Sequence, residues 1–166
     1  RRLNLMLENN LSLSSAILSK NLNSSIESPK KYNFIRGDIR DKEKVMNLIT
    51  KGDFSYVFHL AEFVGHFPCE ADPSKTKEVN YGGTQNVVAG VLKAKNSPRL
   101  IYNSSSSIYH VSKDGKPFTE ESPLPDFNIL DVYCKNKILC ERHIIRKAKG
   151  GKNFEFLIFR PATVSG

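Results

Sequence analysis

Tyr133 and Lys137 are the residues of this sequence whose types and spacing point most directly to chemistry. They are four positions apart in a segment with helical spacing, so they share one face of that helix. A tyrosine hydroxyl has a pKa of about 10, and a neighbouring ammonium lowers it by favouring the phenolate. A serine hydroxyl facing the same point, from the run at 104–107, binds an oxygen that gains or loses a proton. With a hydride acceptor, such a set oxidises an alcohol.

The elements that must position these groups alternate between strands and helices. Apolar or β-branched runs predict strands at 2–9, 32–37, 54–61, 99–103 and 154–159. Helices are predicted at 16–25, after the N-cap residue Asp41, at 73–94 (weakened by Gly82 and Gly83), and at 132–148 after Asp131. This alternation is typical of a parallel sheet with helices on both faces.

Polar clusters follow the predicted strands, at the edge of the sheet where such folds bind ligands. They are 37–38, 59–62, 104–107 and 160–165, and the long helix adds Asn80 to them. The sequence therefore predicts that the chemistry lies at the carboxyl ends of the strands.

The composition is that of one ordinary folded domain. The chain has 166 residues, 39% of them hydrophobic and 25% charged, which supplies a buried core and excludes a wholly disordered chain. No apolar run approaches the ~18–20 residues that a membrane span needs. Three cysteines without a CxxC pair predict neither a disulfide framework nor a metal site and favour a reduced, intracellular and cytoplasmic location. The first residues do not have the pattern of a signal peptide.

The net charge of +8 raises the question of nucleic acid as a partner. Basic residues gather at 135–152 and at 1–36. However, the sequence has no zinc finger, no RNP signature and no basic stripe interleaved with aromatic residues. A solvated, lysine-rich surface is the better interpretation.

Seven segments together make the sequence similar to a known family. The segments, in order, are 37–41, 56–61, 79–86, 104–109, 119–124, 133–137 and 160–166. In type, order and spacing they resemble the extended short-chain dehydrogenases/reductases, in the group of NAD-dependent nucleotide-sugar epimerases and dehydratases. The resemblance implies a Rossmann-type α/β fold, a doubly wound parallel sheet that is incomplete here.

The resemblance also implies an activity and its catalytic residues. Tyr133 matches the family's acid/base, Lys137 its partner, which also holds the nicotinamide ribose, and Ser105 the catalytic serine. The implied function is an NAD(P)-dependent, epimerase-type oxidation of a nucleotide sugar by transient hydride transfer at a sugar hydroxyl. The implied cofactor is NAD, and the implied substrate is a nucleotide sugar.

Further residues match the family's cofactor contacts. They are Asn9, Asp38, Ile39, Phe58, Leu60, Ala61, Asn80, Tyr133, Lys137, Pro161 and Val164. Asn9 stands where the family often has an acid that binds the adenosine ribose. Because an amide does not repel a 2′-phosphate, NADP stays open as an alternative to NAD.

The sequence departs from the family pattern around the substrate. Ser106 and Ser107 stand where the dehydratase branch has Asp-Glu, which argues against 4,6-dehydration. Glu62 replaces a common small residue and places a carboxylate near the substrate mouth, so Glu62, Ser106 and Ser107 are the predicted substrate contacts. The altered Glu62, His110 and Ser165 favour an alternative function, a non-catalytic Rossmann-fold subunit or cofactor-sensing module in a larger assembly.

The glycine-rich phosphate-binding turn of the family does not occur in this sequence. Residues 1–166 are therefore expected to be a partial dinucleotide-binding domain without the substrate domain, with the full-length protein forming a possible homodimer. The family's second and third strands are expected to lack their central partner strand. Alone, these residues are expected to bind cofactor poorly and to be inactive.

Overall fold

The computed structural model describes the chain in segments that cover most of its length. These are residues 2–4, 15–18, 32–109, 112, 115–150 and 153–162. The predicted contacts Asn9 and Val164, and the altered positions His110 and Ser165, lie outside the described residues.

Six strands form one sheet, in the order β3-β1-β2-β4-β5-β6. The strands are β1 (Arg2–Asn4), β2 (Ser15–Leu18), β3 (Tyr32–Asn33), β4 (Tyr56–His59), β5 (Arg99–Asn103) and β6 (Phe156–Phe159). β4, β5 and β6 are parallel, with Val57 opposite Leu100 and Tyr102 opposite Ile158. β1 and β3 are also parallel, whereas β2 runs antiparallel to both of its neighbours, β1 and β4.

Two expectations are wrong at β2. The sequence predicts a helix over 16–25, but residues 15–18 are a strand, because pairing with β1 and β4 on both sides satisfies the backbone groups there. The same strand occupies the place between β1 and β4 that was expected to lack a partner. The sheet is therefore continuous through this position, with one antiparallel strand in it.

Most of the predicted helices are confirmed. The helical elements are α1 (Lys42–Lys51), α2 (His66–Ala71), α3 (Pro73–Thr76), the π-helix η1 (Lys77–Gly82), α4 (Gly83–Lys93), the 3-10 helices η2 (Ser106–Tyr109) and η3 (Phe127–Ile129), and α5 (Val132–Ala148). Asp41 caps α1 by accepting from the Lys44 amide at 3.0 Å. The predicted helix 73–94 is present as α3, η1 and α4, with one π turn in the middle.

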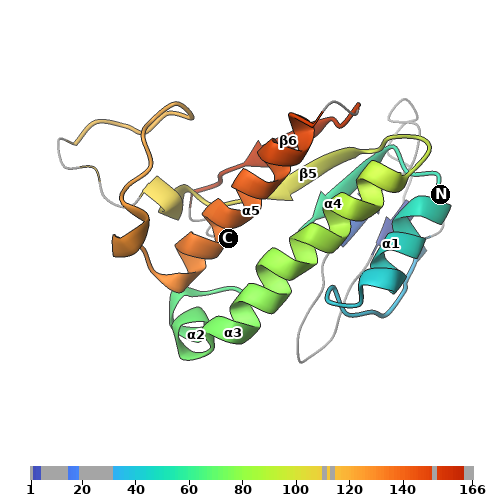
Figure 1. Cartoon of the computed structure of the whole chain (residues 1–166), viewed down its shortest axis with the longest axis horizontal. Helices are drawn as coiled ribbons and strands as arrows, with labels where there is room; N and C mark the ends of the chain where they lie inside the picture. The colour runs from blue at the N-terminus through green and yellow to red at the C-terminus, as the bar shows by residue number, and fades with distance from the viewer. Residues whose placement is uncertain are drawn as a thin grey trace.

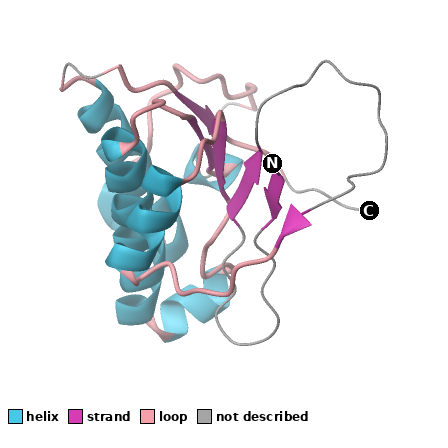
Figure 2. Cartoon of the chain, turned by 90° about the vertical axis from the view of Figure 1, so that its right-hand side faces the viewer, coloured by secondary structure: helices cyan, strands magenta, loops and turns pink. Residues whose placement is uncertain are grey.

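In the described part of the chain the long helices α1, α4 and α5 lie together on one face of the sheet (Figures 1 and 2), rather than on both faces as predicted. Their apolar residues pack on the buried residues of β4 and β5. This core includes Ile49, Val87, Val88, Val91 and Ile144 from the helices and Val57, Leu100 and Tyr102 from the strands.

A second, smaller cluster packs the start of α5 against η2. It consists of Ile108, Tyr109, Leu130, Cys134 and Ile138. This cluster fixes the first turns of α5 against the segment that follows β5, which is where the predicted catalytic residues lie. None of the described helices is long and apolar enough to cross a membrane.

Candidate functional site

Tyr133 and Ser105 meet at the carboxyl end of β5. Asp131 is the N-cap of α5, where its Oδ1 accepts from the Cys134 amide at 2.7 Å, and this cap places Tyr133 in the first turn. Ser105 comes two residues after the end of β5, and its side chain forms a hydrogen bond with Tyr133 that partly opposes the rise in the pKa of the phenol caused by burial. The Ser105 hydroxyl also donates to Ser107 Oγ at 3.1 Å. The structure therefore brings these two predicted catalytic groups together.

Lys137 lies one helical turn further on and is buried, with 1% of its side chain exposed. Its Nζ donates to a carboxylate oxygen of Glu62 and, at 2.5 Å, to the backbone carbonyl of Asn103. Nζ is 5.6 Å from the centroid of the Tyr133 ring. The other oxygen of Glu62 accepts from the Tyr102 hydroxyl at 2.8 Å. The ammonium therefore sits close to Tyr133, with its charge countered by Glu62.

The electrostatics of Tyr133 differ from the expectation that a lysine alone would lower its pKa. Burial first, and then the charge of Glu62, raise the pKa of Tyr133 to about 12. Burial also raises the pKa of Glu62, and the charge of Lys137 opposes that rise. The expectation of a lowered pKa is wrong because the sequence showed neither the burial of the phenol, which raises its pKa most, nor the carboxylate partner of Lys137.

Asp38 and Ile39, predicted to contact adenine, form the turn before α1. The carboxylate of Asp38 is held in a fork by Arg40, at 3.1 Å from Nε and 2.6 Å from Nη2, and this pairing lowers the pKa of Asp38. Ile39 is buried, and its carbonyl accepts from Asn86 Nδ2 at 2.9 Å. The turn is thus fixed to α4 through Asn86.

The predicted contacts after β4 differ in their exposure. Phe58 is half-buried, Leu60 is 39% exposed, and Ala61 is fully buried in the core. Asn80 lies on η1 and is buried, and its side-chain amide forms two hydrogen bonds with the backbone of Phe63. Its Oδ1 accepts from Phe63 N at 2.7 Å, and its Nδ2 donates to Phe63 O at 2.9 Å. Asn80 therefore fixes the segment that carries Glu62, while its contact with a cofactor stays a prediction.

The three predicted substrate residues, Glu62, Ser106 and Ser107, have different surroundings. Ser106 lines a cavity of about 610 Å³ that also includes Tyr109, Phe118, Phe159 and Arg160. The Ser106 amide donates to the carbonyl of Pro161 at 3.0 Å, which ties that cavity to the end of β6. The Ser107 amide donates to Ser105 Oγ at 3.2 Å, whereas the carboxylate of Glu62 is buried against Lys137. Substrate contacts at these three residues stay predictions.

Sequence reasoning missed the partners of Lys137. The carbonyl of Asn103 comes from β5, as does Tyr102, which donates to Glu62, and Glu62 comes from the segment after β4, so only the folded sheet brings them together. One signal was available, because Glu62 is the only carboxylate in the apolar segment 54–64. A carboxylate in such a segment is rarely buried without a partner.

The family follows from a match over nearly the whole sequence. Residues 6–166 match the NAD dependent epimerase/dehydratase family. The chain belongs to this family. Its curated relatives include CDP-paratose 2-epimerase of Salmonella typhi, 36% identical over 78 residues that make up 47% of this chain and 23% of that protein. Another is short-chain dehydrogenase/reductase family 42E member 1 of Bos taurus, 27% identical over 144 residues, 83% of this chain and 36% of that protein.

Solved structures of this kind confirm the Rossmann-type α/β fold. UDP-glucose 4-epimerase from Bifidobacterium longum, in complex with NAD+ and UDP, superimposes with a TM-score of 0.70 at 21% identity. The match covers 79% of this chain and 38% of that one. The chain thus spans well under half the length of these relatives, and NAD is the cofactor of the family to which it belongs.

Proposed function

We propose that the protein is an NAD-dependent oxidoreductase of the epimerase type, which acts on a sugar hydroxyl of a nucleotide sugar. The observation that carries the proposal is the meeting of Ser105, Tyr133 and Lys137 at the carboxyl end of β5. The family match and the activities that give two relatives their names, CDP-paratose 2-epimerase and UDP-glucose 4-epimerase, support the substrate class. Residues 1–166 supply its dinucleotide-binding part.

The side chains present fit the nicotinamide half of NAD. An ammonium has three N–H donors, and Lys137 donates two of them, one to Glu62 and one to the carbonyl of Asn103. The third donor can serve a ribose hydroxyl. Lys137 and Tyr133 are therefore the residues that would hold this end of the cofactor, which supplies the acceptor for a hydride.

Each catalytic side chain has a separate task in this proposal. The Tyr133 oxygen takes the proton of the sugar hydroxyl and later returns it. The Ser105 hydroxyl binds the same sugar oxygen while its charge changes. The positive charge of Lys137 stabilises the phenolate. The negative charge of Glu62, which pairs with Lys137, opposes this stabilisation. The need for a phenolate predicts that activity rises with pH up to the pKa of Tyr133 in the assembled site.

Replacing Tyr133 with Phe tests this proposal. Removal of a general acid/base costs on the order of 10²–10⁴-fold in rate, so the Tyr133→Phe variant of the full-length protein should lose turnover by that factor while its fold persists. The measurement is conversion of UDP- and CDP-hexoses in the presence of NAD+, resolved by chromatography, with circular dichroism for the fold. Tyr81→Phe is the matched control, because Tyr81 packs on His143, away from Ser105. Undiminished turnover in the Tyr133 variant would refute the proposal.

The Glu62–Lys137 pair favours a second candidate, a Rossmann-fold protein that binds the dinucleotide without catalysis. In that case the carboxylate that occupies Lys137 and the raised pKa of Tyr133 keep the phenol protonated. Calorimetric titration of the full-length protein with NAD+ and NADP+ separates the two. Binding without turnover on any sugar nucleotide supports the second candidate, and binding with turnover supports the first.

A further inference from the structure

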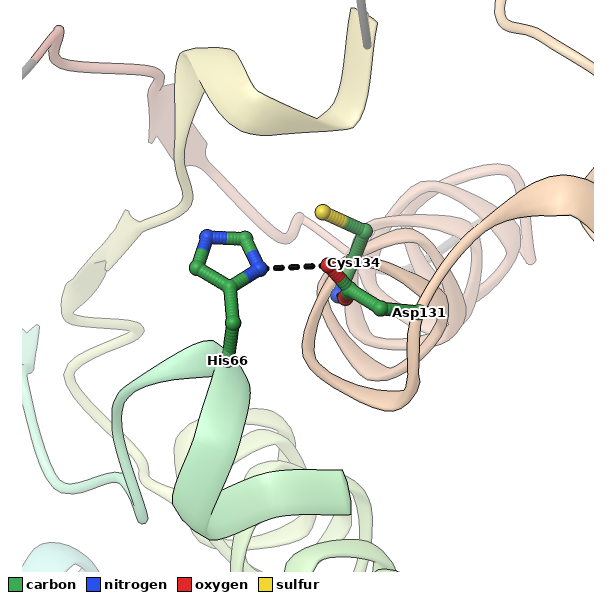
Figure 3. Close-up of side chains that lie close together, drawn as sticks. All are labelled: His66, Asp131 and Cys134. Atoms are coloured by element: carbon green, nitrogen blue, oxygen red, sulfur yellow. Dashed lines mark hydrogen bonds and ion pairs between the residues drawn. The ribbon is translucent and has the colours of Figure 1, made fainter.

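His66, Asp131 and Cys134 form a cluster of three different metal-ligand types, drawn from two helices. His66 is the first residue of α2, Asp131 caps α5, and Cys134 lies in the first turn of α5. One ligand atom of each lies within 4.8 Å of those of the other two. Figure 3 shows the imidazole of His66 directed at the start of α5, where the carboxylate and the thiol lie side by side.

The local structure holds this cluster in place. Because Oδ1 of Asp131 accepts from the Cys134 amide at 2.7 Å, its Oδ2 is turned toward His66 Nδ1, with which it forms a hydrogen bond. Glu70, from the last turn of α2, accepts from the Val132 amide at 2.6 Å and ties the two helices together at the same point. The backbone that carries the ligands is therefore fixed before any ion binds, so that only the side chains of His66 and Asp131 have to adjust.

The charges around the cluster favour a cation. Asp131 and Glu70 place two carboxylates at the start of α5. The side chain of His66 is 55% exposed and that of Asp131 is 31% exposed, so an ion can enter from solvent. Cys134 is buried and lies on the inner side of the cluster.

We propose that His66, Asp131 and Cys134 form a binding site for a zinc-type divalent ion, with a fourth position open to solvent. Nitrogen, oxygen and sulfur donors together suit Zn²⁺ or Co²⁺, whereas Mg²⁺ and Ca²⁺ require oxygen ligands. His66 Nδ1 and Asp131 Oδ2 move apart to admit the ion between them. The Cys134 S–H bond breaks as the metal–sulfur bond forms, and its proton passes to solvent.

Occupancy of this site has a consequence for Tyr133, which lies between the two α5 ligands in the sequence. The ring of His66 packs edge-on to that of Tyr133, with 5.0 Å between their centroids. Zinc is therefore expected to inhibit turnover by holding His66 against the phenol. This consequence rests on the proposed function. Metal binding does not depend on the proposed function, and it is measured without substrate.

Cobalt titration of the full-length protein tests the site directly, because a cysteine ligand produces a sulfur-to-cobalt charge-transfer absorption. The expected result is a stoichiometry of one, displacement of Co²⁺ by Zn²⁺, and loss of the charge-transfer band in Cys134→Ser. His66→Ala and Asp131→Asn are expected to weaken binding at least about tenfold, since even outer partners of metal ligands are worth about 10–100-fold. The Asp131→Asn variant keeps the helix cap, and His66→Ala removes a side chain that is 55% exposed and takes nothing out of the buried core.

Matched controls use residues of the same types outside the cluster. Cys69→Ser removes a buried thiol that donates to the carbonyl of Phe63, and His143→Gln removes a histidine that packs on Tyr81. Both should bind cobalt as the unmodified protein does. The site is refuted if cobalt does not bind, if it binds without the charge-transfer band, or if the controls lose affinity as much as the three ligand variants. Intact binding without inhibition of turnover would refute only the consequence for Tyr133.

Discussion

Glu62 is the residue that separates this site from a simple tyrosine–lysine pair. With Lys137 it forms an ion pair in which only 3% and 1% of the two side chains are exposed. A buried pair adds little net stability, but loss of one partner leaves an uncompensated charge and costs about 3–5 kcal/mol. The pair therefore ties the segment after β4 to α5, and it also controls the charge that Tyr133 experiences.

Replacing Glu62 with Gln should lower the pKa of Tyr133 from about 12 toward its ordinary value. The negative charge of Glu62 opposes the phenolate, and its removal also leaves the Lys137 ammonium free to favour it. The measurement is a pH titration of ¹³C-labelled tyrosine by NMR, in which the Tyr133→Phe variant identifies the resonance. Glu70→Gln is the control, because Glu70 bonds to the Val132 amide and is not among the causes of the Tyr133 shift. An unchanged pKa in the Glu62 variant would mean that burial alone keeps the phenol protonated.

The long helical segment from α3 to α4 depends on one glycine that approaches the turn after β3. A Cβ atom added at Gly83 would lie 2.6 Å from Cγ1 and 2.8 Å from Cγ2 of Ile39, a buried and β-branched residue with little freedom to move. At Gly82, by contrast, a Cβ would meet nothing closer than the Lys77 carbonyl at 3.9 Å. The sequence shows two adjacent glycines, and only the structure distinguishes them.

Alanine substitutions at these two positions should have opposite effects on the free energy of unfolding. Gly83→Ala should destabilise the protein by about 1–3 kcal/mol through the clash with Ile39. Gly82→Ala should stabilise it by about 0.5–1 kcal/mol, because the backbone there is already helical and alanine loses less entropy. Urea denaturation of both variants measures the difference. Equal effects at the two positions would contradict the close approach of Gly83 to Ile39.

The elements that sequence reasoning predicted correctly are those fixed by local chemistry. Asp131 as an N-cap and the Tyr133–Lys137 spacing depend on residues within one or two turns, and α5 starts and ends where they predict. The strand at 15–18 was not predicted, because its stability comes from pairing with strands on both sides. The contact of Glu62 with Lys137 spans 75 residues and that of His66 with Asp131 spans 65, so neither leaves a local pattern.

Buried histidine links the stability of the whole molecule to pH. His59 lies at the end of β4 and is completely buried, with Nε2 2.9 Å from the Thr84 hydroxyl. Its Nδ1 has no partner among the described residues, so a proton there would have no acceptor. Burial, and then the charge of Lys137, lower the pKa of His59 to about 3, and burial lowers that of His143.

Stability should therefore fall as the pH drops below about 6.5, the pKa of histidine in an unfolded chain. Between that pH and about 3, the unfolded chain binds a proton at His59 that the native state does not, so the native state loses up to about 1.4 kcal/mol per pH unit. For His59 alone the loss between pH 7 and pH 5 is about 2 kcal/mol. Urea denaturation at these two pH values measures it.

The variant His59→Gln isolates this contribution, because glutamine keeps an N–H for Thr84 and does not titrate. The variant should lose about 2 kcal/mol less than the unmodified protein between pH 7 and pH 5, and His143→Gln should recover the smaller remainder. The net charge of +8 adds repulsion as the carboxylates become protonated, but that term is common to all three proteins and is reduced by salt. A pH dependence that persists unchanged in His59→Gln would show that charge repulsion, and not the buried imidazole, governs the acid stability of this fold.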